Sequence, residues 1–300
     1  MMAQTSVNVS TAVEMAVKSE AKIAPRPQDG HLSIESVYKT YDPDGARVVA
    51  LEDCSVNIDP GDFLAIVGPS GCGKSTLMNI IAGFDNVTGG QVLLDGQVLA
   101  SPSSPPRPGP DRVVVFQNGA LFPWKTVLEN VMYGPMVQKR MSPKEAEAQA
   151  MSLLSKCGGL DKVAASYPPQ LSSGMQRRVE IVRALINEPK ILLLDEPFRA
   201  MDTVSKGVMH QHLLQMYRTC RKTIVFITHD LEEAIYLADR VIVMTSRPGT
   251  IKTTINVDLP RPRTPDMMLS KEYLDLKAQA ITSVHEEAKK AFERGEREHA

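Results

Sequence analysis

The stretch that decides the fold is a run of nine residues, Gly68-Pro69-Ser70-Gly71-Cys72-Gly73-Lys74-Ser75-Thr76. Its spacing fits G-x-x-x-x-G-K-[ST], a loop that cradles phosphate between a strand and a helix. The apolar run 63–67 predicts that strand, the apolar spacing over 77–81 predicts the helix, and Gly83 suits its end. Glycines let backbone N–H groups approach phosphate oxygens, and the helix directs its positive end at the anion. We therefore expect residues 68–76 to bind a nucleotide phosphate.

The loop and a second apolar run, 191–194, predict the residues that carry the reaction. Asp195 and Glu196 directly follow this second run. Lys74 is expected to neutralise β- and γ-phosphate charge, and the Ser75 hydroxyl to bind Mg²⁺. Open α/β sheets bind ligands at the carboxyl ends of their strands. Asp195 is therefore expected to hold Mg²⁺, directly or through water, and Glu196 to polarise a water that attacks the γ-phosphate. Taken alone, an apolar strand that ends in two ordinary acids is the alternative interpretation.

The composition of the 300-residue chain limits the classes of protein it can belong to. It is 43% hydrophobic and 23% charged, as expected of a globular protein with a substantial core. A net charge of −1 argues against nucleic-acid binding by bulk charge. No apolar run approaches the ~18 residues of a membrane span, and the N-terminus does not resemble a secretory signal, so we expect a cytosolic protein. The four cysteines are widely spaced and are expected to be reduced thiols.

The pattern along the chain predicts a β-rich first part and a helical middle. Residues 1–30 are expected to be a flexible N-terminal extension. Residues 32–37 alternate as a half-buried strand does, and Asp95-Gly96 predicts a hairpin turn. Residues 113–116 are expected to form a buried strand. A capping box at Ser142 and Glu145 predicts the start of a helix in the middle section, 118–185.

The second half predicts a sheet with helices around it. From residue 179 onward, short apolar strands alternate with helical patterns, which favours a mostly parallel sheet. The strands are expected at 191–194, 223–227 and 241–244, and the helices at 203–219 and 230–238. Beyond Pro265 a further helix is expected, with apolar residues every three or four positions. We expect this stripe to pack on the main domain, with partner binding as the alternative; its members are Leu274, Ala278, Ile281, Val284, Ala288 and Phe292.

A family resemblance enters at the segment Leu171-Ser172-Ser173-Gly174-Met175. It is similar to the LSGGQ signature of the ATP-binding subunits of ABC transporters. Small residues that open a helix can present a hydroxyl and backbone N–H groups to a phosphate. Ser173 replaces a glycine and Met175 a glutamine, and methionine there is common in importer subunits. Without its context, the segment would be better interpreted as an ordinary N-capped amphipathic helix.

Further segments resemble the same family in the same order. His229, after an apolar strand, resembles the switch histidine that contacts the γ-phosphate. Gln117 resembles the Q-loop glutamine, which senses Mg²⁺ and water, and Asp202 the D-loop aspartate. Tyr41 resembles the aromatic residue that stacks on adenine, although a surface tyrosine is the alternative. Arg199 departs from the small residue usual in the D-loop.

The resemblance covers about residues 32–260 and implies a fold. The expected class is α/β, a P-loop NTPase (RecA-like) core with an antiparallel β subdomain and an inserted α-helical subdomain. The expected cassette spans residues 31–262, with its helical subdomain at about 118–178 and a C-terminal helical tail at 263–300. Segments 119–131 and 246–249 further resemble the ATPases that serve nitrate, sulfonate and taurine importers.

The resemblance also implies a function, namely the ATP-hydrolysing subunit of a bacterial ABC importer. The cofactors would be ATP and Mg²⁺, with Ser75, Gln117 and Asp195 around the metal. A homodimer or pseudo-dimer would hold each ATP between residues 68–76 of one chain and residues 171–175 of the other. The partners would be integral-membrane permease subunits and, indirectly, a periplasmic or lipid-anchored solute-binding protein, with no nucleic acid. The chain would be peripheral at the cytoplasmic face of the inner membrane.

Three alternatives stay open at this point. A soluble ABC-type ATPase without a transport role shares the same motifs. An ordinary P-loop kinase would leave residues 171–175 unexplained, and a non-catalytic scaffold would leave the catalytic residues without a purpose. Trp124, the only tryptophan, is expected either to line the groove that receives a permease helix or to pack inside the helical subdomain.

Overall fold

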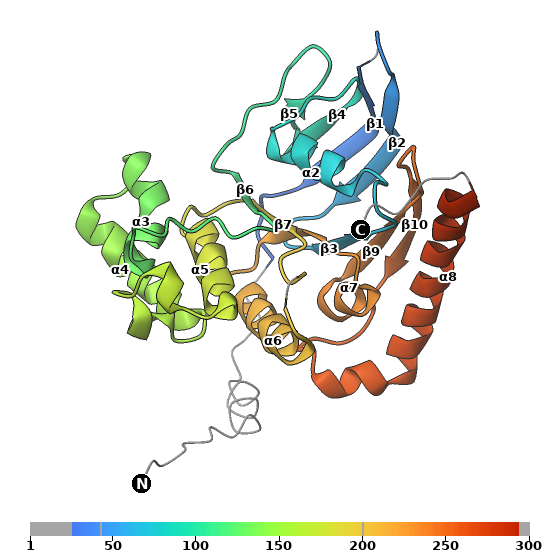
Figure 1. The fold of residues 1–300 in the computed structure, drawn as a ribbon. Helices are drawn as coiled ribbons and strands as arrows, with labels where there is room; N and C mark the ends of the chain where they lie inside the picture. Colours follow the sequence, from blue (N-terminus) through green and yellow to red (C-terminus); the bar gives the residue numbers. More distant parts are fainter. Residues whose placement is uncertain (1–25, 43, 200, 294–300) are drawn as a thin grey trace.

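The computed structural model describes residues 26–42, 44–199 and 201–293. Most of the predicted N-terminal extension, residues 1–25, lies outside the described residues. Within the described chain, two sheets lie together, a group of helices extends to one side, and a long last helix runs along the other side (Figure 1). The division into an extension, a cassette and a tail stays a prediction.

The larger sheet carries the functional motifs. Its six strands follow the order β10-β9-β3-β8-β7-β6. Neighbouring strands from β9 to β6 run parallel and β10 runs antiparallel to β9, which confirms the predicted mostly parallel sheet. The strands are β3 (Phe63–Val67), β6 (Arg112–Val115), β7 (Ile191–Asp195), β8 (Thr223–Ile227), β9 (Arg240–Met244) and β10 (Ile251–Asn256).

The central strands are apolar throughout because both faces of this sheet are covered. Along β3, Phe63, Ala65 and Val67 enter one core cluster, while Leu64 and Ile66 enter another. Helices cover the first face, among them α6 (Thr203–Thr219) and α7 (Leu231–Leu237). The helix α2 (Lys74–Ala82) and the smaller sheet cover the second face.

The smaller sheet is antiparallel and has the order β2-β1-β4-β5. Its strands are β1 (Leu32–Tyr41), β2 (Val48–Ile58), β4 (Gly89–Leu94) and β5 (Gln97–Ala100). The predicted hairpin joins β4 to β5, and both of its turn residues, Asp95 and Gly96, have positive φ angles, 51° and 77°. This sheet begins where the chain leaves Gly30, whose N–H donates to Asp95.

The helical part contains α3 (Val127–Val137), α4 (Pro143–Lys156) and α5 (Ser173–Leu185), on the side of the molecule away from the last helix (Figure 1). Short 3₁₀ turns, η1 (Leu160–Val163) and η2 (Pro168–Gln170), join α4 to α5. The predicted capping box at Ser142 and Glu145 is present at the start of α4. Among the described residues, none of the helices combines the length and the hydropathy that crossing a bilayer requires.

One predicted strand was only partly right. The structure ends β6 at Val115, on the edge of the sheet, and Phe116 is 44% exposed. An edge strand has a neighbour on one side only, so its residues are less covered than those of β7 or β8. Phe116 instead stacks on Phe84, with ring centroids 6.0 Å apart.

The predicted packing of the C-terminal stripe is wrong for most of its residues: Val284 packs against the main core and Ala288 is half-buried, but the others are exposed. The short turn η3 (Pro265–Leu269) leads into α8 (Lys271–Glu293), as the sequence predicts, but the helix buries Tyr273, Ala280 and Glu287. Leu274, Ile281 and Phe292 are 50%, 45% and 84% exposed. The packed face is displaced around the helix because Glu287 is bound there, by Lys252 and by the Ser246 N–H.

Candidate active site

The loop between β3 and α2 ends in a backbone conformation that only glycine fits. Gly73, which precedes α2, has a φ of 96°. A Cβ atom there would lie 2.7 Å from a methyl group of Leu51 and 2.9 Å from the carbonyl oxygen of Ala50. The tight turn allows backbone N–H groups of the loop and of the first turn of α2 to converge on one position. This is the geometry that binds an anion.

Lys74, the first residue of α2, is held inside this loop. Its ammonium group donates to the carbonyl oxygens of Gly68 and Pro69, both at 2.9 Å, and lies 3.6 Å from the Cys72 sulfur. The residue is only 8% exposed. A cation fixed by carbonyls at the mouth of the loop is positioned to meet a phosphate.

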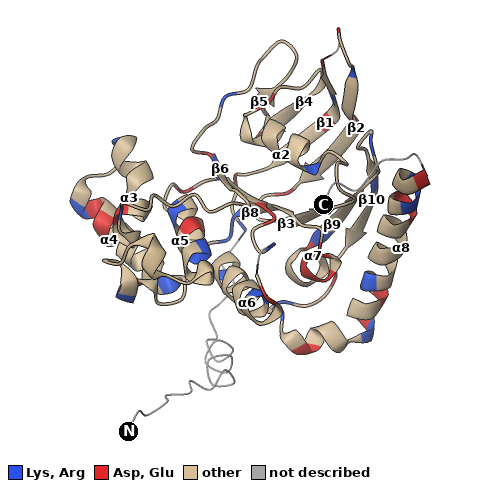
Figure 2. Ribbon diagram, in the orientation of Figure 1, with Lys and Arg blue, Asp and Glu red and all other residues tan. Residues whose placement is uncertain are grey.

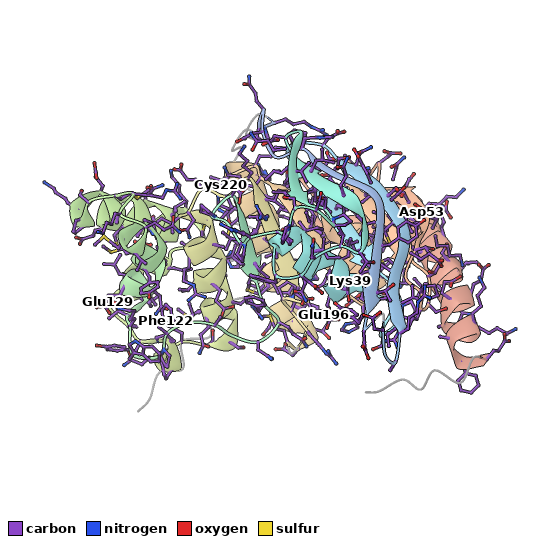
Figure 3. All side chains as sticks on the ribbon, turned by 90° about the horizontal axis from the view of Figure 1, so that it is seen from above. Lys39, Asp53, Phe122, Glu129, Glu196 and Cys220 are labelled. Atoms are coloured by element: carbon purple, nitrogen blue, oxygen red, sulfur yellow. The ribbon has the colours of Figure 1, made fainter. Side chains whose placement is uncertain are left out.

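A cavity of about 450 Å³ gathers most of the predicted site residues. It lies where the carboxyl ends of β3, β7 and β8 meet, the edge at which such sheets bind ligands. The predicted residues that line it are Tyr41, Gly68, Ser70, Gly71, Cys72, Gly73, Lys74, Ser75, Thr76, Gln117, Asp195, Glu196 and His229. Glu196 lies near the middle of the molecule, between Phe122 in the helical part and Lys39 in the β-rich part (Figure 3).

Glu196 is held in a strained conformation at the end of β7. Its φ is 40°, a region that residues with side chains seldom adopt and that is often found at functional sites. The His229 Nδ1 atom lies 3.5 Å from Glu196 Oε2, and an Arg199 guanidinium nitrogen lies 3.3 Å from the same oxygen. Two nitrogen groups therefore bracket one carboxylate oxygen beside the phosphate loop.

Asp195 carries a charge that the surrounding protein does not favour. Burial, and then the negative charge of Glu196, raise the pKa of Asp195, while Lys74 acts in the opposite direction. Ser75, Gln117 and Asp195 offer a hydroxyl, an amide and a carboxylate to the same cavity, all of them oxygen donors of the kind that Mg²⁺ takes. No group of three or more His, Cys, Asp or Glu side chains forms a metal site among residues 26–42, 44–199 and 201–293. The donor set fits a Mg²⁺ shared with a nucleotide phosphate rather than an ion held by protein alone.

The predicted signature segment lies outside this cavity. Ser172 accepts a hydrogen bond from the Met175 N–H, 3.3 Å away, and so caps α5. Leu171 is buried in the core. Ser173 lines a second cavity of about 450 Å³, together with Gln117 and Arg199. Within one copy, the P-loop and the signature segment therefore do not share a binding cavity.

Two other predicted residues have clear local roles. Asp202 caps α6 by accepting from the N–H groups of Val204 and Ser205, both at 3.0 Å. Tyr41 lies at the cavity with its hydroxyl 2.6 Å from Asp85, and burial, followed by that hydrogen bond, raises the pKa of Tyr41.

The sequence prediction missed Arg247 as a residue of the cavity wall. It belongs to the turn after β9, which Gly249 fixes to the β-rich part: the Gly249 N–H donates to Ala50, and the Glu52 N–H donates to Gly249, both at 3.0 Å. A cation just beyond the carboxyl end of a predicted strand was the signal that could have revealed it.

The site combines a phosphate loop, a half-buried acid, and a strained glutamate with its histidine, all at one edge of a mostly parallel sheet. This combination defines a P-loop ATPase. Comparisons with known proteins agree. Residues 51–199 match the family model for the ABC transporter domain. An uncharacterised ABC transporter ATP-binding protein of Methanocaldococcus jannaschii is 41% identical over 261 residues, 87% of this chain and 94% of that protein.

A second relative is the nitrate import ATP-binding protein NrtD of Synechococcus elongatus. It is 38% identical, over 84% of this chain and 90% of its own length. Among solved structures, the dimeric structure of a bacterial ABC transporter cassette matches with a TM-score of 0.63 and 32% identity, over 76% of this chain and all of that one.

The chain belongs to the ABC transporter ATP-binding proteins. It is an ATP-binding cassette that hydrolyses ATP, and its predicted α/β fold class is confirmed. The kinase and scaffold alternatives are thereby excluded.

Proposed function

We propose that this chain is the ATP-hydrolysing subunit of an ABC importer, bound peripherally at the cytoplasmic face of the membrane. One observation carries the proposal: Lys74, Asp195, Glu196 and His229 line one cavity, from which the signature residues Ser172 and Gly174 are absent. The site therefore contains the parts for hydrolysis in one copy and lacks the parts that close over the nucleotide.

A second copy would supply the missing half. In a head-to-tail pair, the N-terminus of α5 of the second copy would present the Ser172 hydroxyl and backbone N–H groups to the γ-phosphate. Two surfaces rich in N–H groups would then be joined by the negative phosphates between them. Cleavage and release would remove this attraction and reopen the pair, a ligand-biased two-state change.

The catalytic roles follow from the contacts around Glu196. His229 and Arg199 contact the carboxylate, which limits its freedom, and Glu196 would take up the proton of the attacking water. Lys74 would neutralise charge on the β- and γ-phosphates, and His229 would lie against the γ-phosphate. When bound through Ser75, Gln117 and Asp195, Mg²⁺ would supply further neutralisation of phosphate charge. The protein thus contributes positioning and charge, which phosphoryl transfer needs most.

The permease would dock in a groove next to the Q-loop. A cavity of about 550 Å³ is lined by aromatic side chains, two of them on the Q-loop and its extension; they are Phe84, Phe116, Phe122 and Tyr133. Trp124 is 71% exposed and lies with its ring centroid 5.6 Å from that of Phe122, so the alternative of interior packing does not hold. Exposed aromatic residues around a concave surface are typical of protein interfaces.

The solute is expected to be nitrate, a sulfonate, taurine or a similar small molecule, brought by a solute-binding protein. The resemblance of segments 119–131 and 246–249, and a relative named for nitrate import, support this class.

Reconstitution tests the proposal. The chain is co-purified with its permease, and the complex is reconstituted into proteoliposomes. ATP-driven uptake of labelled nitrate, taurine and an alkanesulfonate is then measured, with the Glu196→Gln variant as control. We expect the unmodified complex to take up one of these solutes and the Glu196→Gln complex to take up none. ATP hydrolysis by a chain that associates with no membrane protein would instead identify a soluble ABC-type ATPase.

A further inference from the structure

Helix α8 carries an apolar strip that the rest of the described chain leaves largely exposed, with only Ala288 half-buried. The α8 strip consists of Leu274, Ala278, Ile281, Ala288 and Phe292. Its three large members are 45–84% exposed. Along the helix the strip extends for about 27 Å. An apolar strip of this length, interrupted only by His285, is typical of a surface that binds a partner.

The helix that presents the strip is held by its other face. Tyr273 and Ala280 are buried against the sheet and α7, and the Tyr273 hydroxyl donates to the Glu232 carbonyl at 3.2 Å. Glu287, 2% exposed, is bound by Lys252 at 2.9 Å and by the Ser246 N–H at 3.2 Å. Because α8 is already folded in one copy, an association through the strip does not have to pay for helix formation.

The spacing of the strip is that of a coiled-coil seam. Two and a half heptads fit, with alternating steps of four and three residues. The d positions are Leu274, Ile281 and Ala288, and the a positions are Ala278, His285 and Phe292. The small alanines allow close approach of a second helix between the larger layers.

The charges beside the strip indicate what that second helix is. Both Asp275 and Lys289 occupy e positions, which face each other across an antiparallel pair. Two antiparallel copies of α8 would place Asp275 beside Lys289 of the other copy, twice. A parallel pair would oppose Lys277 to Thr282 and Val284 to Lys289, with no attraction. Figure 2 shows basic and acidic residues distributed along α8.

We propose that α8 pairs antiparallel with α8 of a second copy, in a contact that needs no nucleotide. A two-fold axis makes such a contact self-complementary. The helix also lies next to the nucleotide face, because Lys277 pairs with Glu232 on α7, which begins two residues after His229. In copies joined at α8, the two nucleotide faces would have a raised effective concentration with respect to each other, which would favour their association when ATP binds. This inference does not rest on the proposed transport function.

Sedimentation of the full, nucleotide-free chain over a dilution series tests the pairing. The unmodified chain is expected to dimerise weakly, because half of the layers are alanine or histidine. Ile281→Glu is expected to weaken the dimer about 10-fold or more, since it places charge inside the seam. Gln279→Glu adds the same charge to an exposed position off the strip and is expected to change nothing.

Charge exchange tests the orientation with surface changes that leave the fold intact. Asp275→Lys and Lys289→Asp are each expected to weaken the dimer about 3-fold, and together to restore it. Three results would each overturn the proposal. They are a nucleotide-free chain that stays monomeric, equal effects of Ile281→Glu and Gln279→Glu, and no restoration of the dimer by the double exchange. The Glu196→Gln variant with ATP measures the nucleotide-dependent dimer separately. The proposal of the α8 dimer and the proposal of the ATP-bound dimer can therefore be refuted independently.

Discussion

Arg177 and Glu180, one turn apart on α5, form a buried ion pair at 2.6 Å that also holds the segment around Gln117. The Arg177 guanidinium donates to the carbonyl oxygens of Phe116 and Gln117 at 2.6 and 2.5 Å, and Glu180 accepts from the Ala120 N–H at 2.6 Å. The helix that begins with the predicted signature segment is thus bound to the loop that brings Gln117 to the candidate active site.

Breaking this pair is expected to damage stability and catalysis together. Arg177→Met leaves Glu180 buried without its partner, which costs about 3 kcal/mol or more. Denaturant unfolding and ATPase rates of Arg177→Met, Glu180→Gln and the double variant measure the coupling. The double variant is expected to lose less than the two single losses added together. Effects that add within about 0.5 kcal/mol would show that the two residues act independently.

Glu196→Gln is expected to keep ATP binding and to lower the turnover rate about 100-fold or more, because the amide cannot accept the proton of the attacking water. ATP should then hold the variant as a closed dimer, which light scattering after gel filtration detects. Glu272→Gln, an exposed change on α8, serves as the control. Hydrolysis at the parental rate would remove Glu196 from the catalytic role.

Lys74→Ala is expected to weaken ATP binding about 10- to 100-fold, the effect of losing charge-assisted hydrogen bonds to phosphate. Titration with a fluorescent ATP analogue measures it, with the exposed Lys144→Ala as the control. Because the lysine also holds the carbonyls of Gly68 and Pro69, its loss is expected to make the empty loop less ordered. Unchanged affinity would contradict the phosphate assignment.

Asp195→Asn is expected to stabilise the nucleotide-free protein at neutral pH. The pKa of Asp195 is raised above its ordinary value of 3.8 by burial and by Glu196, so the native state binds the proton more tightly than the unfolded state does. Ionisation therefore costs stability: the cost is absent below pH 3.8, grows as pH rises toward the native pKa and is complete above it. Melting temperatures of both proteins from pH 7 downward should converge in acid. A less stable variant at pH 7 would refute this, and exposed Asp258→Asn is the control.

Thiol labelling is expected to reach Cys220 before Cys72. Burial raises the pKa of the Cys72 thiol, although Lys74 opposes this, and the residue is 1% exposed, whereas Cys220 is only partly buried. A maleimide reagent followed by peptide mass spectrometry gives both rates, with and without ATP, and Cys220→Ser provides the control. Fast labelling of Cys72 in the native protein would point to a loop that opens readily.

Short-range patterns predicted the elements that build the site. Glycine and lysine spacing identified the loop at residues 68–76, apolar runs identified β3, β7 and β8, and Ser142 with Glu145 identified the start of α4, because each depends on contacts within a few residues. The contribution of Arg247 to the cavity could not be predicted, since it depends on how Gly249 binds to β2, about two hundred residues earlier in the chain.

The sequence by itself determined the class of chemistry: its ordered motifs specify a phosphate loop, two acids and a histidine at the ends of strands. Only the tertiary structure decided which groups meet and which faces are covered. Periodicity shows that α8 has an apolar stripe, but Glu287 bound to Lys252 and Ser246 sets how the helix is turned. The physical reason is that a local pattern specifies an element, whereas its orientation is chosen by the distant contacts that satisfy its buried polar groups.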